Sequence, residues 1–307
     1  MPLSHYTTVA VLGRLQEDPC ALLLQALADL PCRVLRLNQG RAQRAATAWG
    51  LDAHGALVGQ VDDAAGAVAL GDISGLYLRP ADERQTGACD RAAAQGWTQA
   101  WIEIAELAPW PVANRVSAML SNGSKVFQSQ CLAAAGFAVP PMLLSNAPDA
   151  VLAFEAAHGP LIYKSASGVR SIVCTLDGAS RARLHDVRHT PTLFQKRLSG
   201  TNVRVHVVGH TVFATEIDSD VVDYRYAGQQ GGQTELRATT LPQDLQALCI
   251  KATRELGLDF AGLDLMLADD GLAYCFEANP SPGYSWYESA TGQPIAAALA
   301  RHLCGID

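Results

Sequence analysis

The chain has 307 residues, of which 49% are hydrophobic and 17% charged. This composition is typical of a globular protein and unlike that of a disordered one, and the length allows two domains or three small ones that share interfaces. The net charge of −7 argues against general binding to nucleic acid or to a membrane surface, because both need a basic field. A local basic pocket remains compatible with this charge.

The amino terminus and the cysteines together predict a cytoplasmic protein. The start, MPLSHYTTVAVLG, has no basic region ahead of a long apolar run, so no signal peptide is expected. No stretch reaches the roughly 18 apolar residues of a membrane helix. The eight cysteines form no C-x-x-C pair, and most lie in apolar runs. We therefore expect buried free thiols and neither a disulfide framework nor a zinc site.

Residues 1–110 have the periodicity of a small α/β domain. Strands are predicted at 8–13, 33–37, 56–61 and 75–78, with helices at 19–28 and 88–107. The segment APWP (108–111) interrupts the last helix, because proline does not fit a helix interior, and we place the first domain boundary there.

Residues 111–194 predict a central subdomain with the size of a lid. A helix over 124–135 ends at Gly136, which has the conformational freedom that a helix end requires. The expected elements that follow are a strand at 142–144, a helix at 149–158, a strand ending at Lys164, the loop SASGVRS and a strand at 172–176.

Residues 195–307 predict a third unit built on hairpins. A strand at 192–198 leads into a hairpin over 203–217 that turns at Gly209–His210, and a second hairpin covers 261–280. Helices are expected at 242–256 and 293–304, and the polar, glycine-rich segment 218–234 is predicted to be a mobile loop. His206 and His210 are expected to face solvent or a polar partner.

The second hairpin contains a pair of acidic residues in apolar sequence. If Asp270–Gly271 forms a two-residue turn, Asp264 lies opposite Glu277, and Asn279 shares their face. Opposed carboxylates repel, so losing either one should be neutral or stabilising without metal. Three oxygen ligands at a strand end suit magnesium. The alternative, that Asp264 pairs with a lysine or arginine, stays open at this point.

Cations elsewhere in the chain favour a site for nucleotide phosphates. Lys164 ends an apolar strand just before the small-residue loop that contains Ser167 and Gly168, whose backbone N–H groups could face a polyphosphate. Lys125 opens a helix, where positive charge is unfavourable unless an anion binds. Arg204 lies inside an apolar strand, and Arg225 lies in the polar loop.

The ordered motifs resemble the ATP-grasp superfamily, in particular the branch of ribosomal-protein glutamate ligases and microviridin-type peptide cyclases. The resemblance covers roughly residues 111–298. The motifs in chain order are NRVSAMLSNGSKVFQSQCLAAAGFAVP, PLIYKSASG, LFQKRLSGTNVRVHVVG, LDFAGLDLML and FEANPSPG. Two shorter segments, GLYLRP (75–80) and DYR (223–225), are similar to the Y-x-R-R and D-W-R segments of the peptide-cyclase branch.

This resemblance implies an α/β (α+β) ATP-grasp fold with three parts: an N-terminal pre-ATP-grasp domain (1–110), a central lid subdomain (111–194) and a C-terminal subdomain with an antiparallel sheet (195–307). It also implies roles for particular residues. Lys125 and Lys164 would hold ATP phosphates, Arg204 the phosphates and the acyl phosphate, and Asp264, Glu277 and Asn279 magnesium. Gln195, Lys196, Arg197 and Leu198 would form the linker that reads adenine. The family usually has an acidic residue where Lys196 stands, so that side chain would not contact the nucleotide as a carboxylate.

The implied activity is ATP-dependent formation of an amide or related bond through an acyl phosphate, with magnesium, or manganese as an alternative, as the ion. Arg225 is the candidate for binding the acceptor carboxylate, with a purely solvated role as the alternative. The substrates would be a small-molecule or peptide carboxylate and an amine, with no nucleic acid or membrane partner. Two other functions stay open: a graspetide-type cyclase of peptide side chains, and a nucleotide-binding regulatory protein without catalysis. A homo-oligomer is also left open.

Overall fold

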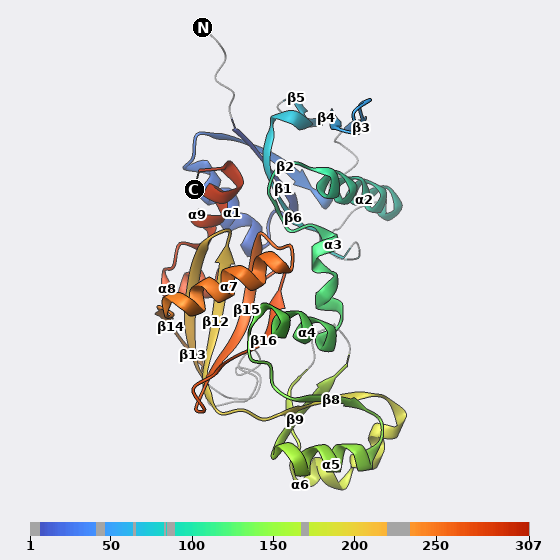
Figure 1. The fold of residues 1–307 in the computed structure, drawn as a ribbon. Helices are drawn as coiled ribbons and strands as arrows, with labels where there is room; N and C mark the ends of the chain where they lie inside the picture. The colour runs from blue at the N-terminus through green and yellow to red at the C-terminus, as the bar shows by residue number, and fades with distance from the viewer. Residues whose placement is uncertain are drawn as a thin grey trace.

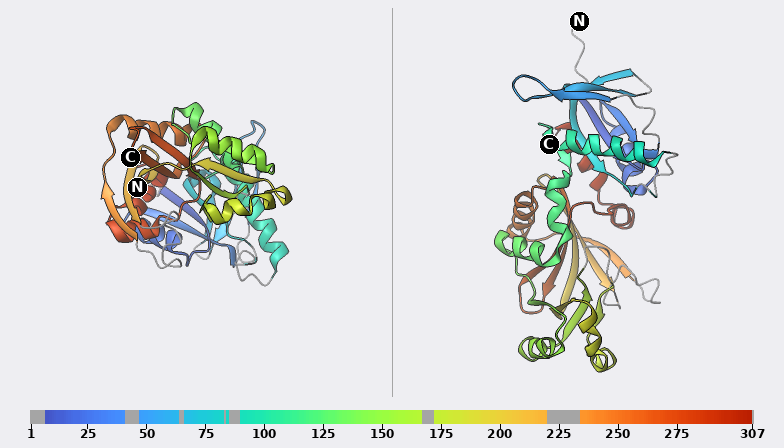
Figure 2. Two further views of the ribbon diagram at one scale, coloured as in Figure 1. Left: turned by 90° about the horizontal axis from the view of Figure 1, so that it is seen from below. Right: turned by 90° about the vertical axis from the view of Figure 1, so that its right-hand side faces the viewer.

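The computed structural model describes residues 7–40, 47–63, 66–82, 84, 90–166, 172–219 and 234–306. Its strands form four sheets, and helices pack against them (Figure 1). The N-terminal sheet, the five-stranded C-terminal sheet and the central sheet follow one another along the long axis of the molecule (Figures 1 and 2). The middle position in space is therefore taken by the C-terminal sheet, not by the segment that is central in sequence.

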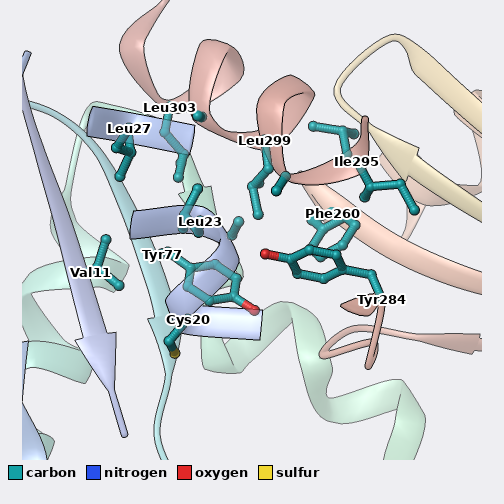
Figure 3. Close-up of a cluster of buried hydrophobic side chains, with 14 of the residues drawn as sticks. Val11, Cys20, Leu23, Leu27, Tyr77, Phe260, Tyr284, Ile295, Leu299 and Leu303 are labelled. Carbon is teal, nitrogen blue, oxygen red and sulfur yellow. The ribbon is translucent and has the colours of Figure 1, made fainter. Parts of the chain in front are cut away.

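The N-terminal sheet is parallel, in the order β2-β1-β6-β7. Its strands are β1 (Thr7–Gly13), β2 (Cys32–Asn38), β6 (Ile73–Arg79) and β7 (Val112–Ala113). Both faces of β1 are buried, so its residues alternate between two cores. Val9 and Val11 face the core made with α1 (Asp18–Ala28) and α9 (Ile295–Cys304), and Ala10 and Leu12 face that of α2 (Arg91–Leu107). Figure 3 shows the first of these cores.

A small antiparallel sheet follows β2, and the sequence predicted only its middle strand. Its strands are β3 (Thr47–Leu51), β4 (Leu57–Asp63) and β5 (Gly66–Ala69). The two outer strands contain glycine and alanine, which have weak preference for strands, so their pairing with β4 determines their conformation.

The central sheet has the order β10-β9-β11-β8. Its strands are β8 (Met142–Ser145), β9 (Leu161–Ser165), β10 (Cys174–Thr175) and β11 (Thr192–Lys196), and its helices are α5 (Pro148–His158) and α6 (Gly178–Ala182). The strand predicted at 172–176 is therefore shorter than expected. Phe194 and Leu161 face a core with Val151 of α5, which leaves the opposite face of the sheet for other contacts.

The C-terminal sheet is fully antiparallel, in the order β14-β13-β12-β15-β16. Its strands are β12 (Gly200–Val208), β13 (Thr211–Ser219), β14 (Thr234–Thr239), β15 (Phe260–Ala268) and β16 (Ala273–Asn279). The helices α4 (Lys125–Ala135) and α7 (Gln243–Glu255) cover one face. Two short helices, α3 (Val116–Met119) and α8 (Ser285–Thr291), complete the chain.

Two elements of this region have different bounds from those predicted. The segment 218–234 was expected to be one loop, but β13 extends to Ser219 and β14 begins at Thr234; residues 220–233 lie outside the described part. The helix predicted from residue 124 begins at Lys125, and Ser124 is its cap because the Ser124 hydroxyl accepts from the Phe127 N–H at 3.3 Å. Gly136 ends it with a left-handed φ of 114°, as predicted.

Candidate active site

The hairpin of β15 and β16 places Asp264 directly opposite Glu277, as predicted, although the turn and the register near it differ from the prediction. The turn is not the expected two-residue one: Ala268 and Leu272 are joined by a backbone hydrogen bond across three residues, and Gly271 has a left-handed φ of 84°. This shifts the register near the turn by one. An irregularity at Phe276 shifts it back, so Leu265 pairs with Cys275 but Asp264 pairs with Glu277.

A cavity of about 390 Å³ lies between the central and C-terminal sheets. Ile162 and Lys164 of β9 line it together with Gln195 of β11, because Gln195 is the register partner of Ile162 and shares its face. The wall on the C-terminal sheet includes Asp264 and Glu277. An ammonium group and two carboxylates thus face one cavity.

The segment after β11 forms the edge of this cavity. Arg197 and Leu198 line it. The N–H groups of Lys196 and Arg197 donate to the carbonyls of Pro141 and Pro160, at 3.0 and 2.8 Å. Among the described residues, the structure records no hydrogen bond from the Leu198 N–H. This backbone donor is therefore available to a ligand, whereas those of the two preceding residues already serve the fold.

Arg204 is not among the residues that line the cavity; it lies beside Asp264, its register partner on the neighbouring strand. Its Nη1 is 2.7 Å from Asp264 Oδ1, and its side chain is only 6% exposed. The guanidinium carbon lies 5.7 Å from the centre of the Tyr287 ring. The alternative left open by the sequence, an arginine partner for Asp264, is therefore present in the structure.

Lys125 and Lys164 line different cavities. Lys125, at the start of α4, lines a smaller cavity of about 160 Å³ together with Ala166 and Leu193. Leu193 is the register partner of Lys164, so the two cavities meet at the same strands. The predicted site residues Ser167, Gly168 and Arg225 lie outside the described residues.

Two buried amides that the sequence analysis did not single out hold the strand with Glu277 and Asn279. Gln128 of α4 pairs with both backbone groups of Ala278, donating to its carbonyl at 2.9 Å and accepting from its N–H at 3.0 Å. Asn114 donates to the carbonyls of Phe260 and Pro280, both at 2.5 Å. The only signal in the sequence was their place inside the motifs, since Asn114 opens N-R-x-x-A and Gln128 closes K-x-x-Q.

The oxygen donors of the hairpin suit a hard divalent cation. Asp264 and Glu277 are register partners, and Asn279 follows opposite Gly262. Within the described part of the chain, no group of three or more His, Cys, Asp or Glu residues could hold a metal ion. Two carboxylates and an amide are few ligands, and magnesium typically takes few protein ligands with phosphate oxygens and water as the rest. The donor set thus fits magnesium bound with a nucleotide.

His206 of β12 is fully buried, which corrects the expectation that it faces solvent or a polar partner. It contacts the rings of Phe260 and Tyr287, at 6.3 and 5.0 Å between centroids. Within the described residues neither ring nitrogen has a hydrogen-bond partner. Burial lowers the pKa of His206 well below its usual range, and the charge of Arg204 adds to this effect. The residue is therefore neutral in the folded protein.

We expect the buried His206 to make the protein less stable as pH falls. An unfolded histidine takes up a proton below about pH 6.5, but the folded one does not, so the unfolded state is favoured in acid. Urea unfolding at about pH 7.5 and about pH 5.5 should show the wild type losing about 1.4 kcal/mol more than His206→Phe. Equal losses in both proteins would contradict this origin.

The cavity lies between two sheets and is lined by a lysine and two carboxylates. The sequence profile of the RimK-like ATP-grasp domain matches residues 123–303. This match covers more than half of the chain, which therefore belongs to the RimK-like ATP-grasp family.

Individual proteins are also similar to this chain. A "Probable alpha-L-glutamate ligase" of Pasteurella multocida is 30% identical in an alignment of 203 positions that covers 63% of this chain and 64% of that protein. The similarity thus spans less than two thirds of the relative's length. Among solved structures, a RiPP-associated ATP-grasp ligase of Chryseobacterium gregarium, in complex with ADP and a leader and core peptide, has a TM-score of 0.78 at 18% identity and covers 98% of this chain and 97% of its own.

A second solved structure shares the fold. The ATP-grasp ligase PsnB, complexed with minimal precursor, Mg and ADP, has a TM-score of 0.75 at 23% identity, with coverage of 97% of this chain and 96% of its own. These likenesses confirm the predicted ATP-grasp fold of mixed α/β type. Over the described residues, no helix combines the length and the apolar character that a bilayer crossing needs.

Proposed function

We propose that this protein is an ATP-dependent ligase that joins a carboxylate to an amine through an acyl phosphate and releases ADP and phosphate. One observation carries the proposal: Lys164 on one sheet and Asp264 and Glu277 on the other line the same cavity. Phosphoryl transfer depends mainly on positioning and on neutralising charge, and these groups can do both. Membership of the RimK-like ATP-grasp family supports ATP as the substrate.

Different residues of the chain would bind the phosphates and the adenine of ATP. Lys164 would donate to the phosphates, with Lys125 and the backbone of Ser167 and Gly168 as further donors. Residues 195–198 would bind adenine through backbone groups. Of these, the Leu198 N–H is the donor at the cavity edge. The Lys196 N–H already donates to the Pro141 carbonyl, so this residue would contribute only its own backbone carbonyl.

Asp264, Glu277 and Asn279 would hold magnesium, with Mn²⁺ as the alternative ion because it accepts the same oxygen ligands. When bound, the ion neutralises phosphate charge and aligns the phosphates with the attacking carboxylate. Arg204 does not line the cavity, so it would act through its ion pair with Asp264: its positive charge would stabilise from there the negative charge that develops on the acyl phosphate. Arg225 would bind the acceptor carboxylate through a two-point contact.

The decisive experiment is incubation of the protein with magnesium, ATP and a panel of carboxylates and amines. The proposal expects ADP, and not AMP, to form only when a suitable carboxylate is present. The Glu277→Gln variant is the matched control, because it keeps the size and shape of the side chain but removes a ligand charge. AMP as the product, or no turnover with any carboxylate, would contradict the proposal; binding without turnover would favour the regulatory alternative.

A second candidate is the ligation of peptide side chains. The observation that favours it is the match of the whole chain to ligases solved with precursor peptides. Peptides that contain glutamate and aspartate beside serine, threonine or lysine should then be converted to products lighter by one water. Mass spectrometry decides between the two, because a small-molecule ligase would leave such peptides unchanged.

Lys164→Ala should weaken nucleotide binding more than Lys125→Ala does. Lys164 lines the cavity shared with the two carboxylates, whereas Lys125 lines the smaller neighbouring one. A ligand that binds only the folded state raises the melting temperature, so the shift caused by magnesium-ATP measures this loss. Equal shifts in the wild type and both variants would contradict the assignment of phosphate contacts.

A further inference from the structure

The segment that follows Asn279 is held by residues of the N-terminal sheet and its helices. Arg79, the last residue of β6, donates from Nη1 to the Ser281 hydroxyl at 2.9 Å and to the Pro282 carbonyl at 3.2 Å. The Tyr284 hydroxyl donates to the Pro19 carbonyl at 2.5 Å, inside the core that Figure 3 shows. The partners in each of these hydrogen bonds are far apart in sequence. The bonds are therefore tertiary contacts and not part of a local turn.

Ser281 in turn fixes the side chain of Asn279. The Ser281 N–H donates to Asn279 Oδ1 at 2.9 Å. An amide oxygen has two lone pairs, so this bond orients the oxygen and leaves room for one more partner. The orientation of the proposed magnesium ligand therefore depends on where Ser281 lies.

The guanidinium of Arg79 is itself fixed from several sides. Its Nε lies 3.7 Å from Glu17 Oε2, and its side chain is 19% exposed. Nη1 is also 3.4 Å from the Tyr77 hydroxyl. A planar group held in this way can fix the position of the loop that it contacts, which a flexible lysine ammonium would do less well.

We infer that Arg79 is a positioning residue for magnesium: through Ser281 it sets the orientation of the Asn279 amide oxygen. This inference rests on the proposed function, because it assigns Asn279 to the metal. Residues beyond the ligands that orient a ligand typically change metal affinity by about 10- to 100-fold when they are lost. Arg79 acts through one intermediate residue, so we expect a loss of about tenfold.

The test measures ADP binding by calorimetry over a series of magnesium concentrations, together with a metal-free arm containing a chelator. Arg79→Ala should shift the magnesium midpoint about tenfold upward, and Arg79→Lys should recover only part of this. Metal-free ADP binding should stay at the wild-type value. Ser281→Ala, which removes the hydroxyl acceptor but keeps the N–H to Asn279, should shift the midpoint in the same direction by less.

Arg14→Ala is the matched control. Arg14 also pairs with Glu17, at 3.2 Å, but the structure records no contact of it with Ser281 or Pro282 among the described residues, so its midpoint should not move. Urea unfolding checks that each variant is folded, and Ser281→Ala carries the test should Arg79→Ala unfold. The role of Arg79 would be overturned if both Arg79→Ala and Ser281→Ala had the wild-type magnesium midpoint, or if ADP affinity fell equally in the metal-free arm. Neither result would overturn the proposed function. A wild type whose nucleotide binding ignores magnesium would overturn the proposed function as well.

Discussion

Replacing Asp264 with asparagine is expected to abolish ATP turnover and also to lower the free energy of unfolding by about 3 kcal/mol, the scale for breaking a buried ion pair. The reason is that Arg204 is buried beside Asp264, at 2.7 Å, and keeps its charge when the carboxylate is lost. Glu277→Gln should abolish turnover too, but with little loss of stability. Within the described part, the structure records no ion pair of Glu277.

Urea unfolding without metal or nucleotide checks the stability part of this prediction, and ADP release checks the activity. The opposed carboxylates alone would make either substitution neutral or stabilising. Because of its pairing with Arg204, only the substitution at Asp264 is expected to lower the free energy of unfolding. Two variants with equally small stability losses would contradict the importance of the Arg204 contact, and two equally large losses would mean that both carboxylates serve the fold.

Gly262→Ala is expected to displace Arg204 and thereby reduce both stability and turnover. A Cβ atom at this position would lie 2.0 Å from Arg204 Nη2 and 2.8 Å from Pro282 Cβ. Backbone strain is not the cause, since Gly262 does not have a left-handed φ. Either the guanidinium leaves Asp264 or the strands separate, and overpacking of this kind typically costs about 1–3 kcal/mol.

Gly283→Ala provides the control for this prediction, because a Cβ there meets no atom within 4 Å and the residue lies in the same part of the chain. Its unfolding free energy and its ADP release should match those of the wild type. If Gly262→Ala behaves like Gly283→Ala in both measurements, Arg204 has room to move. The close contact between Arg204 and Gly262 would then not matter for stability or turnover.

The predicted opposition of Asp264 and Glu277 is right because two deviations cancel. The turn residues indicated where the hairpin reverses, but not that Gly271 would lengthen the loop by one residue. The apolar pattern of β16 did not show the irregularity at Phe276, which restores the pairing. Alternation of side chains identifies a face reliably, whereas the register along a strand also depends on local irregularities that leave little trace in sequence.

The hydrogen bonds that hold the site together could not be predicted from sequence patterns, because they join residues that are far apart in the chain. Gln128 and Ala278 are 150 positions apart, and Asn114 and Pro280 are 166 positions apart. Nothing local distinguishes these amides from ordinary polar residues. The pairing of Arg204 with Asp264 was left open for the same reason, since the neighbour of a strand in a sheet cannot be deduced from periodicity.

The packing of α9 has a consequence for how this protein is made. Ser74 of β6 bonds to the carbonyl of Leu303, which lies 229 positions later in the chain, and Leu299 and Leu303 complete the core around β1. On the ribosome, the first parallel strands emerge long before the helix that covers one of their faces. During that interval α1 can already pack on this face, but the part of the core that Leu299 and Leu303 supply is missing, and aggregation competes with folding. The core on this face of the N-terminal sheet, although begun first, is therefore complete only once α9 has been made.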